Sequence, residues 1–254
     1  MGQLTKIDIT NFIEPNIQQF HDRRLDSLRQ LDLKKILRRK NPYLFKAKSQ
    51  NSATDLIKTI IDAHLSSQEE AIFGSFLEQL AIYICEKSYR GRKSASEGID
   101  LEFQKNDTFY LVSIKSGPNW GNSRQLSKMK DDFRKAKRIL GANTRDIKVV
   151  AVNGCCYGRD DRPDKGDYLK YCGQQFWEFI SGNPDLYIEI VEPLGHKAKE
   201  KNDKFLKEYK KVINKLTQEF EREYCASDGA ILWQKLLEFN SGMRTESRVS
   251  SARR

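Results

Sequence analysis

The chain has 254 residues, of which 38% are hydrophobic and 31% charged, and its mean hydropathy is −0.70. No run approaches the roughly 18 apolar residues of a membrane helix, and the polar stretch 1–10 lacks the apolar segment of a signal peptide, so we expect a soluble, cytoplasmic protein without a membrane partner. The net charge of +10 favours a polyanionic partner. Nucleic acid is favoured over an anionic membrane, because no basic amphipathic helix with an aromatic face is found.

The cysteines are odd in number and irregular in spacing, which is typical of reduced thiols rather than of a disulfide framework. They are Cys85, Cys155, Cys156, Cys172 and Cys225. A zinc site at Cys155, Cys156 and Cys172 is the alternative, but no neighbouring CxxC or CxxH completes a tetrahedral set.

The first part of the chain reads as helices. Periodic apolar residues predict helices over 17–39 and 52–64, with a break at Pro42. A further helix over about 68–87, capped by Ser66 or Ser67, is apolar almost all round and should be buried. Glu78 lies in the middle of this helix, and a lone carboxylate there needs a partner, either a metal ion or an arginine.

Two strands follow, over 99–103 and 110–115, joined by the turn-like residues 104–107. Their apolar residues alternate, which should turn Ile99, Leu101 and Phe103 towards the core on the first strand and Tyr110, Val112 and Ile114 on the second. The opposite face then carries Asp100, Glu102, Ser113 and Lys115. The hairpin therefore brings a carboxylate and an ammonium group to one side, near its end.

The remaining pattern predicts a helix from Asn122 or Ser123 to about 140, a strand over 147–152, a helix over 171–181, a strand over 186–191, and helices over 199–224 and 231–239. The expected fold is α/β, a helix, mixed sheet and helix core with helical additions at both ends. We expect four parts. They are an N-terminal helical region (1–67) that forms either an arm around DNA or a dimer interface, the core (68–195), a C-terminal helical region (196–240) and a disordered tail (241–254).

Phosphodiester cleavage needs a set of groups like that on the hairpin. A carboxylate such as Asp100 can hold a divalent cation against the scissile phosphate, and a lysine such as Lys115 can orient or deprotonate the attacking water. Oxygen ligands favour Mg²⁺. The alternative is an ordinary cross-strand Asp–Lys contact on the surface.

The segments 97–103 and 110–122, with the string Ser-Gly-Pro-Asn-Trp-Gly-Asn at 116–122, resemble the PD-(D/E)XK nucleases and, more narrowly, the PmeII-type group of type II restriction endonucleases. The resemblance runs from the helix of Glu78 to Trp177, and it implies the restriction-endonuclease fold. It implies catalytic roles for Asp100, Lys115, Glu78 and Ser113, and metal ligation by Asp100, Glu78 and the backbone carbonyl of Ile114, with Mg²⁺ as the ion and Mn²⁺ as a substitute. Ser113 departs from the pattern, because an acid should stand there. Glu78 is the candidate replacement, with Glu102 and Glu97 as alternates.

Eight basic and two acidic residues between Lys115 and Arg138 predict a phosphate-binding helix directly after the active-site loop. The DNA contacts expected there are Asn119, Asn122, Ser123, Arg124 and Lys128. Arg159 and Arg162, in the loop 158–167, are candidates for hydrogen bonds to guanine bases. The alternative is that this segment is a flexible surface loop without a role in recognition.

The expected function is that of a homodimeric type II restriction endonuclease, which hydrolyses double-stranded DNA at a specific sequence with Mg²⁺ and has a companion DNA methyltransferase. A repair or junction nuclease of the same fold, or a non-catalytic DNA-binding module on a nuclease core, are the alternatives.

Overall fold

The computed structural model describes residues 4–143 and 148–243. The chain divides into two compact units. The sheet unit comprises the described parts of 1–21 and 71–198, and the helical unit those of 22–70 and 199–254. The helices α1 (Lys6–Arg29) and α4 (Ala53–Tyr89) each contribute to both units.

The sheet unit is built on one mixed sheet of five strands, in the order β1-β2-β3-β4-β5. The strands are β1 (Arg92–Lys93), β2 (Leu101–Lys105), β3 (Thr108–Lys115), β4 (Lys148–Cys155) and β5 (Leu169–Cys172). The first three strands pair antiparallel, and β3, β4 and β5 pair parallel. Both central strands therefore end at the same edge of the sheet, where Lys115 is the register partner of Cys155.

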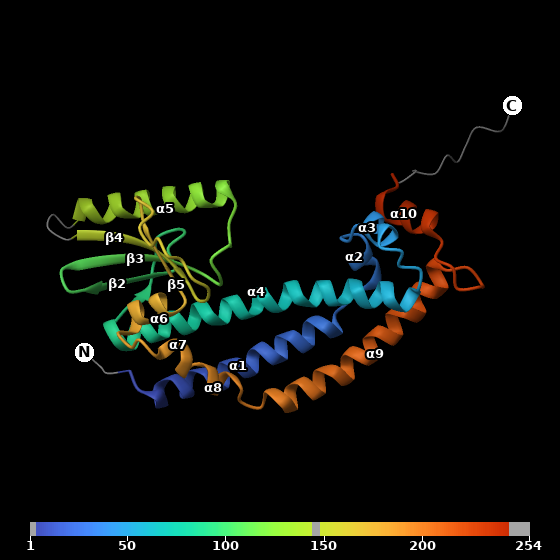
Figure 1. Ribbon diagram of the computed structural model, residues 1–254, viewed down its shortest axis with the longest axis horizontal. Coiled ribbons are helices and arrows are strands. Elements are labelled where there is room, and N and C mark those ends of the chain that lie inside the picture. Colours follow the sequence, from blue (N-terminus) through green and yellow to red (C-terminus); the bar gives the residue numbers. More distant parts are fainter. Residues whose placement is uncertain (1–3, 144–147, 244–254) are drawn as a thin grey trace. The chain divides into compact units, whose positions relative to one another are not determined.

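Helices cover both faces of this sheet (Figure 1). One face packs on α5 (Ser123–Asn143), where Leu111 and Ala151 contact Met129 and Phe133. The other packs on α4 and on α6 (Gln174–Ser181), and its buried side chains include Leu101, Phe103, Val112, Ile114, Val152, Leu80, Ile84, Phe176 and Trp177. The chain thus has an α/β fold with a helix-flanked mixed sheet, and that expectation is confirmed.

Several local predictions in this unit were wrong. Ile99 precedes β2 and packs on the α5 face, so it does not share a face with Leu101. The hairpin face that carries Ser113 is not open, because α5 covers it and Ser113 is 1% exposed. β5 occupies the start of the helix expected over 171–181, and α6 begins only at Gln174.

The strand expected over 186–191 is also wrong. This segment forms two short helices, α7 (Leu186–Glu189) and α8 (Val191–Leu194). Only Leu186 and Ile190 of its apolar residues are buried, while Ile188 and Val191 are exposed. Burial every fourth residue suits one helical face better than a strand.

The helical unit contains α2 (Leu33–Leu37), α3 (Pro42–Ala47), α9 (Ala198–Tyr224) and α10 (Trp233–Ser241), together with the ends of α1 and α4. Its core includes Leu28, Ile36, Leu56, Ile60 and Phe220. The expected helix over 17–39 is replaced by α1 and α2. Ser66 and Ser67 cap no helix: they lie within the single helix α4, where the Ser67 hydroxyl bonds to the Ala63 carbonyl.

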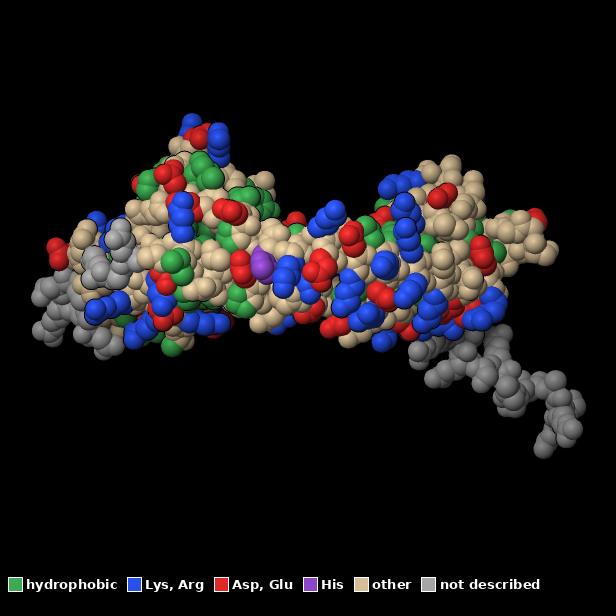
Figure 2. Space-filling model, turned by 90° about the horizontal axis from the view of Figure 1, so that it is seen from below, with side chains coloured by type: hydrophobic (Ala, Val, Ile, Leu, Met, Phe, Trp, Pro, Cys, Tyr) green, Lys and Arg blue, Asp and Glu red, His purple; other side chains and the backbone are tan. Residues whose placement is uncertain are grey.

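Residues 4–21 group with the sheet unit, although they belong to the N-terminal region expected over 1–67. Residues 241–243 are described and the rest of the expected tail lies outside the described residues. None of the helices in the described chain is long and apolar enough to cross a membrane. Charged side chains dominate the long helix α9, and Figure 2 shows Lys and Arg interspersed with Asp and Glu on the surface drawn.

Candidate active site

Asp100 is placed by the backbone just before β2. Gly98 takes φ +75°, a conformation that favours glycine, and a Cβ there would collide with the carboxylate of Asp132. The Asp100 N–H donates to the Val112 carbonyl at 2.9 Å, so the pairing with β3 begins one residue before the strand. Its Oδ2 accepts from the Ile114 N–H at 2.6 Å and from the Ser113 hydroxyl at 3.4 Å. The carboxylate is therefore fixed at the end of β3.

Lys115 is the last residue of β3, and its ammonium lies 3.7 Å from Oδ2 of Asp100. The two side chains are 29% and 24% exposed, so this pair is reachable from solvent. The Lys115 ammonium also lies 5.2 Å from the centre of the Trp120 ring, a cation–π distance. The hairpin thus brings Asp100 and Lys115 together, and the loop after β3 supplies one wall for the lysine.

Glu78, on α4, interacts electrostatically with the same two residues. Partial burial raises the pKa of its carboxyl group, and the nearby charge of Asp100 raises it further, while Lys93 and Lys115 act in the opposite direction. Its carboxyl group therefore lies within electrostatic range of both hairpin residues. Two carboxylates that repel each other beside a lysine form an arrangement that a divalent cation would stabilise.

The other candidate acids are bonded elsewhere. The two oxygens of Glu102 accept from Arg92 and Ser94, both at 2.7 Å. Glu97 is 78% exposed and pairs with Lys128 at 3.1 Å. Within residues 4–143 and 148–243, no three His, Cys, Asp or Glu side chains form a group able to hold a metal ion. A cation at Asp100 and Glu78 would therefore complete its shell with carbonyl oxygens and water, as Mg²⁺ commonly does.

Ser113 is buried and supplies no carboxylate, but its backbone is part of a network that the sequence analysis missed. The Asn153 amide donates to the Ser113 carbonyl at 3.1 Å, and its oxygen accepts from the Trp120 indole N–H at 3.1 Å. Asn153 is fully buried, and it connects β4, β3 and the loop that carries Trp120. An asparagine inside the apolar run of β4 was the sequence signal that could have pointed to it.

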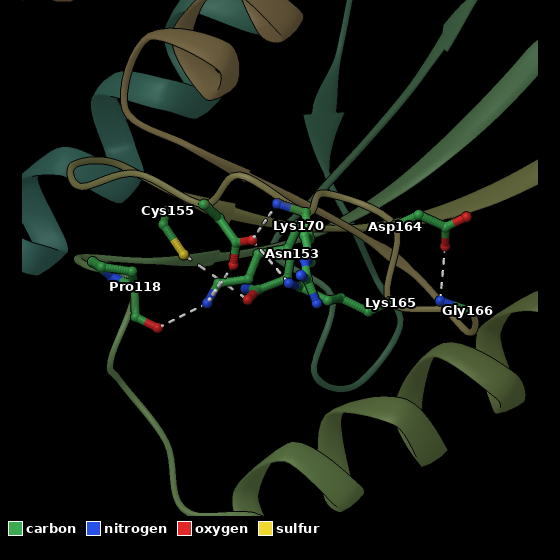
Figure 3. A network of polar contacts seen from close by, with 9 residues as sticks. Pro118, Asn153, Cys155, Asp164, Lys165, Gly166 and Lys170 are labelled. Atoms are coloured by element: carbon green, nitrogen blue, oxygen red, sulfur yellow. Dashed lines mark hydrogen bonds and ion pairs between the residues drawn. The ribbon is translucent and has the colours of Figure 1, made fainter.

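A second polar cluster is centred on Asp160. Its carboxylate pairs with Lys165 at 2.8 Å and with Lys170 at 3.2 Å, and it accepts from the Arg162 N–H at 3.1 Å. Lys170 also donates to the Pro118 carbonyl at 3.1 Å, as Figure 3 shows. The cluster therefore ties the loop 158–167 and β5 to the loop that follows Lys115.

All the side chains expected to contact DNA are exposed, but they differ in their partners. Asn122 caps α5 by accepting from the Gln125 N–H at 3.1 Å. Lys128 pairs with Glu97 and Asp132, which raise its pKa. In contrast, Arg124, Arg159 and Arg162 have no carboxylate within ion-pair distance among the described residues.

The five cysteines are free thiols, and four of them are buried. Burial raises the pKa of Cys156 to about 12, and the nearby charge of Glu78 adds to the effect. Cys155 and Cys172 are register partners on β4 and β5, and burial raises the pKa of both. The thiols of Cys155, Cys156 and Cys172 are therefore neutral packing groups near the candidate site.

The sequence matches the family profile of the type II restriction endonuclease EcoO109I over residues 7–202, about three quarters of the chain. No curated protein matches it at a significant level. The matched range contains Glu78, Asp100, Ser113 and Lys115 and the whole five-stranded sheet. The chain therefore belongs to the EcoO109I family of type II restriction endonucleases, and it is an endonuclease of a restriction system whose substrate is DNA.

Proposed function

We propose that this protein hydrolyses phosphodiester bonds of double-stranded DNA at a specific sequence, that it needs Mg²⁺, and that Asp100, Glu78 and Lys115 carry the reaction. The observation that carries the proposal is the 3.7 Å approach of the Lys115 ammonium to the Asp100 carboxylate, with Glu78 in range of both. Mn²⁺ is the expected substitute for Mg²⁺.

The metal ligands in this proposal are Asp100, Glu78 and the backbone carbonyl of Ile114. Bound Mg²⁺ would neutralise charge at the scissile phosphate and lower the pKa of a coordinated water. Asp100 is supported for this role by its bond to the Ile114 N–H, which fixes one oxygen. Glu78 supplies the carboxylate that Ser113 lacks, and its raised pKa is consistent with a site that has room for a cation.

The role of Lys115 follows from its neighbours. Asp100 keeps its ammonium at the end of β3, and the Trp120 ring limits where it can turn. From there it can orient the attacking water, exchange a proton with it, or donate to the charge that develops on the phosphate. The Ser113 hydroxyl donates to Asp100 and so takes a positioning role rather than that of a ligand.

The proposed partners follow from the restriction assignment. A two-fold dimer would match the symmetry of a palindromic site, and a methyltransferase of the same specificity would protect the host DNA. Arg124, Arg159 and Arg162 are the proposed DNA contacts of the sheet unit, because their charges are not neutralised by neighbouring acids of the described chain. The narrower assignment to the PmeII-type group rests on the string 116–122.

The replacement Lys115→Ala tests the proposal. It should leave duplex binding within about twofold and lower Mg²⁺-dependent cleavage by about 10²–10⁴-fold, the usual contribution of a positioned proton-transfer group. Lys148→Ala is the matched control, because Lys148 is an exposed lysine at the opposite end of the sheet, where it begins β4. Retained cleavage by Lys115→Ala rejects the assignment. Tight binding without cleavage by the wild type, in either Mg²⁺ or Mn²⁺, favours the non-catalytic DNA-binding alternative.

A further inference from the structure

The helical unit has a hollow of about 240 Å³ that the proposed chemistry does not use. It lies between the end of α1, the segment around α2 and the middle of α4. Polar and charged side chains make up most of its lining: Ser27, Gln30, Asp32, Lys35, Arg39, Lys40, His64 and Gln68. Its volume exceeds that of one phosphate group, so an anion of this size can enter it.

The charge around this hollow is strongly unbalanced. Lys35, Arg39 and Lys40 line it, and none of them has a carboxylate within ion-pair distance in the described chain. Asp32 is the one acid in the lining, and it caps α2 by accepting from the Lys35 N–H at 2.8 Å. The neighbouring Lys34, in contrast, pairs with Glu223 at 3.3 Å. Three cations facing one acid leave a net positive site.

The pKa of His64 is shifted by the same excess of positive charge. Partial burial lowers the pKa of its imidazole, and the charges of Lys40 and Arg39 lower it further. Both cations therefore disfavour the protonated form of the ring. A neutral imidazole can donate one hydrogen bond to an anion, and an anion in the hollow would offset the charges that lower its pKa.

We propose that this hollow binds a backbone phosphate of DNA. Lys35, Arg39 and Lys40 would bind the phosphate, together with His64 and the nearby polar side chains. The inference rests on the DNA substrate of the family and adds an anchor outside the sheet unit. Several cations converging on a concave surface suit a phosphodiester, because contacts to phosphate fix the position of a duplex without reading its sequence.

The pKa of His64 measured by NMR tests the site directly. The sequence has three histidines, His21, His64 and His196, so a His64→Gln variant assigns the signal. The pKa should rise when a mixed-sequence duplex is added in the absence of divalent cations, a condition that separates the site from catalysis. Inorganic phosphate forms a second arm. A rise with phosphate but not with bound duplex overturns the assignment to DNA.

The salt dependence of duplex binding gives a second test. Arg39→Gln should weaken binding and reduce the slope of log K against log salt by about one, the effect of losing one phosphate contact. Lys34→Gln, on α2 five residues before Arg39, is the control and should change the slope less, since Glu223 already neutralises that lysine. Equal slopes for Arg39→Gln and the wild type, or equal losses in both variants, overturn the proposal. Failure of the wild type to bind any duplex would instead reject the proposed function itself.

Discussion

Two acid–lysine clusters of the sheet unit contact the loop that follows β3, and they differ in how many lysines pair with the acid. Asp160 has two lysine partners and a backbone N–H, and its pair with Lys170 is 15% and 16% exposed. Asp100 also accepts from a backbone N–H, that of Ile114, and from the Ser113 hydroxyl, but it has a single lysine, at 3.7 Å, in a pair that is 24% and 29% exposed.

The pKa shifts reinforce this difference. The hydrogen bond from Lys165 lowers the pKa of Asp160. Burial lowers the pKa of Lys170, but the bond to Asp160 raises it, and the net shift is a rise. Both shifts favour the charged forms. At the other cluster, burial and the charge of Asp100 raise the pKa of Glu78, which disfavours its charged form. A fully paired cluster is typical of a structural role, whereas a carboxyl group whose charged form is disfavoured marks a candidate functional site.

Asp100→Asn should show the largest effect. The amide keeps the size of the side chain but loses the charge that pairs with Lys115 and that, in the proposed mechanism, would bind a cation. Single-turnover cleavage should fall by about 10³-fold or more, and a higher Mg²⁺ concentration should restore little of it. Duplex binding should remain. A variant that cuts within about tenfold of the wild type would remove Asp100 from the site.

Glu78→Gln should lower cleavage by about 10²-fold, because it removes the acid that stands in for the one missing at Ser113. In the wild type, cleavage should decline as pH falls through the raised pKa of Glu78, at a higher pH than for an ordinary glutamate. In the variant, the cleavage rate should no longer show this decline at low pH. An unchanged pH profile would contradict the role of Glu78.

The stability of the same variant gives the control. A raised carboxyl pKa in the folded state means that the contribution of Glu78 to stability is present at low pH and is lost as pH rises through that pKa. Glu78→Gln should therefore unfold at a higher urea concentration than the wild type at neutral pH, and the difference should disappear in acid. A destabilised variant at neutral pH would indicate a structural ion pair instead.

Lys170→Met should affect stability more than chemistry. It leaves Asp160 paired with Lys165 alone and removes the bond to the Pro118 carbonyl. The expected loss is about 1–2 kcal/mol in urea unfolding, less than for a fully buried pair. Cleavage at low temperature should remain within about tenfold of the wild type. Complete loss of cleavage in a folded Lys170→Met protein would erase the distinction between the two clusters.

Arg124→Gln should have the smallest effect of these changes. Its guanidinium has no acidic partner in the described chain, so its loss should reduce the salt slope of duplex binding by about one. Lys128→Gln should change the slope less, since Glu97 and Asp132 already bind that lysine. Equal slopes for the two variants would show that these ion pairs open when DNA binds.

The proximity of Asp100 and Lys115 could be predicted from the hairpin pattern, although Ile99 departs from the expected alternation. Glu78 could be predicted because a lone acid in an apolar helix needs a partner. The Asp160 cluster could not, since it joins a loop, a four-residue strand and a backbone carbonyl that no periodic pattern connects.

The errors in secondary structure have similar causes. Two serines suggested the start of a helix where α4 continues, because a serine hydroxyl can also bond to the carbonyl four residues earlier, as Ser67 does with Ala63. The apolar residues of 186–191 fit a strand pattern as well as one face of the short helices α7 and α8. Short apolar segments of this kind are decided by tertiary packing.

The most direct test of the account is to digest mixed-sequence duplex DNA with the wild type and with Lys115→Ala in Mg²⁺, and to sequence every end that forms. The account predicts that the wild-type ends share one short recurring sequence and that the variant produces almost no ends. Ends without a common sequence would contradict site-specific restriction. Equal cleavage by the variant would contradict an active site at Lys115.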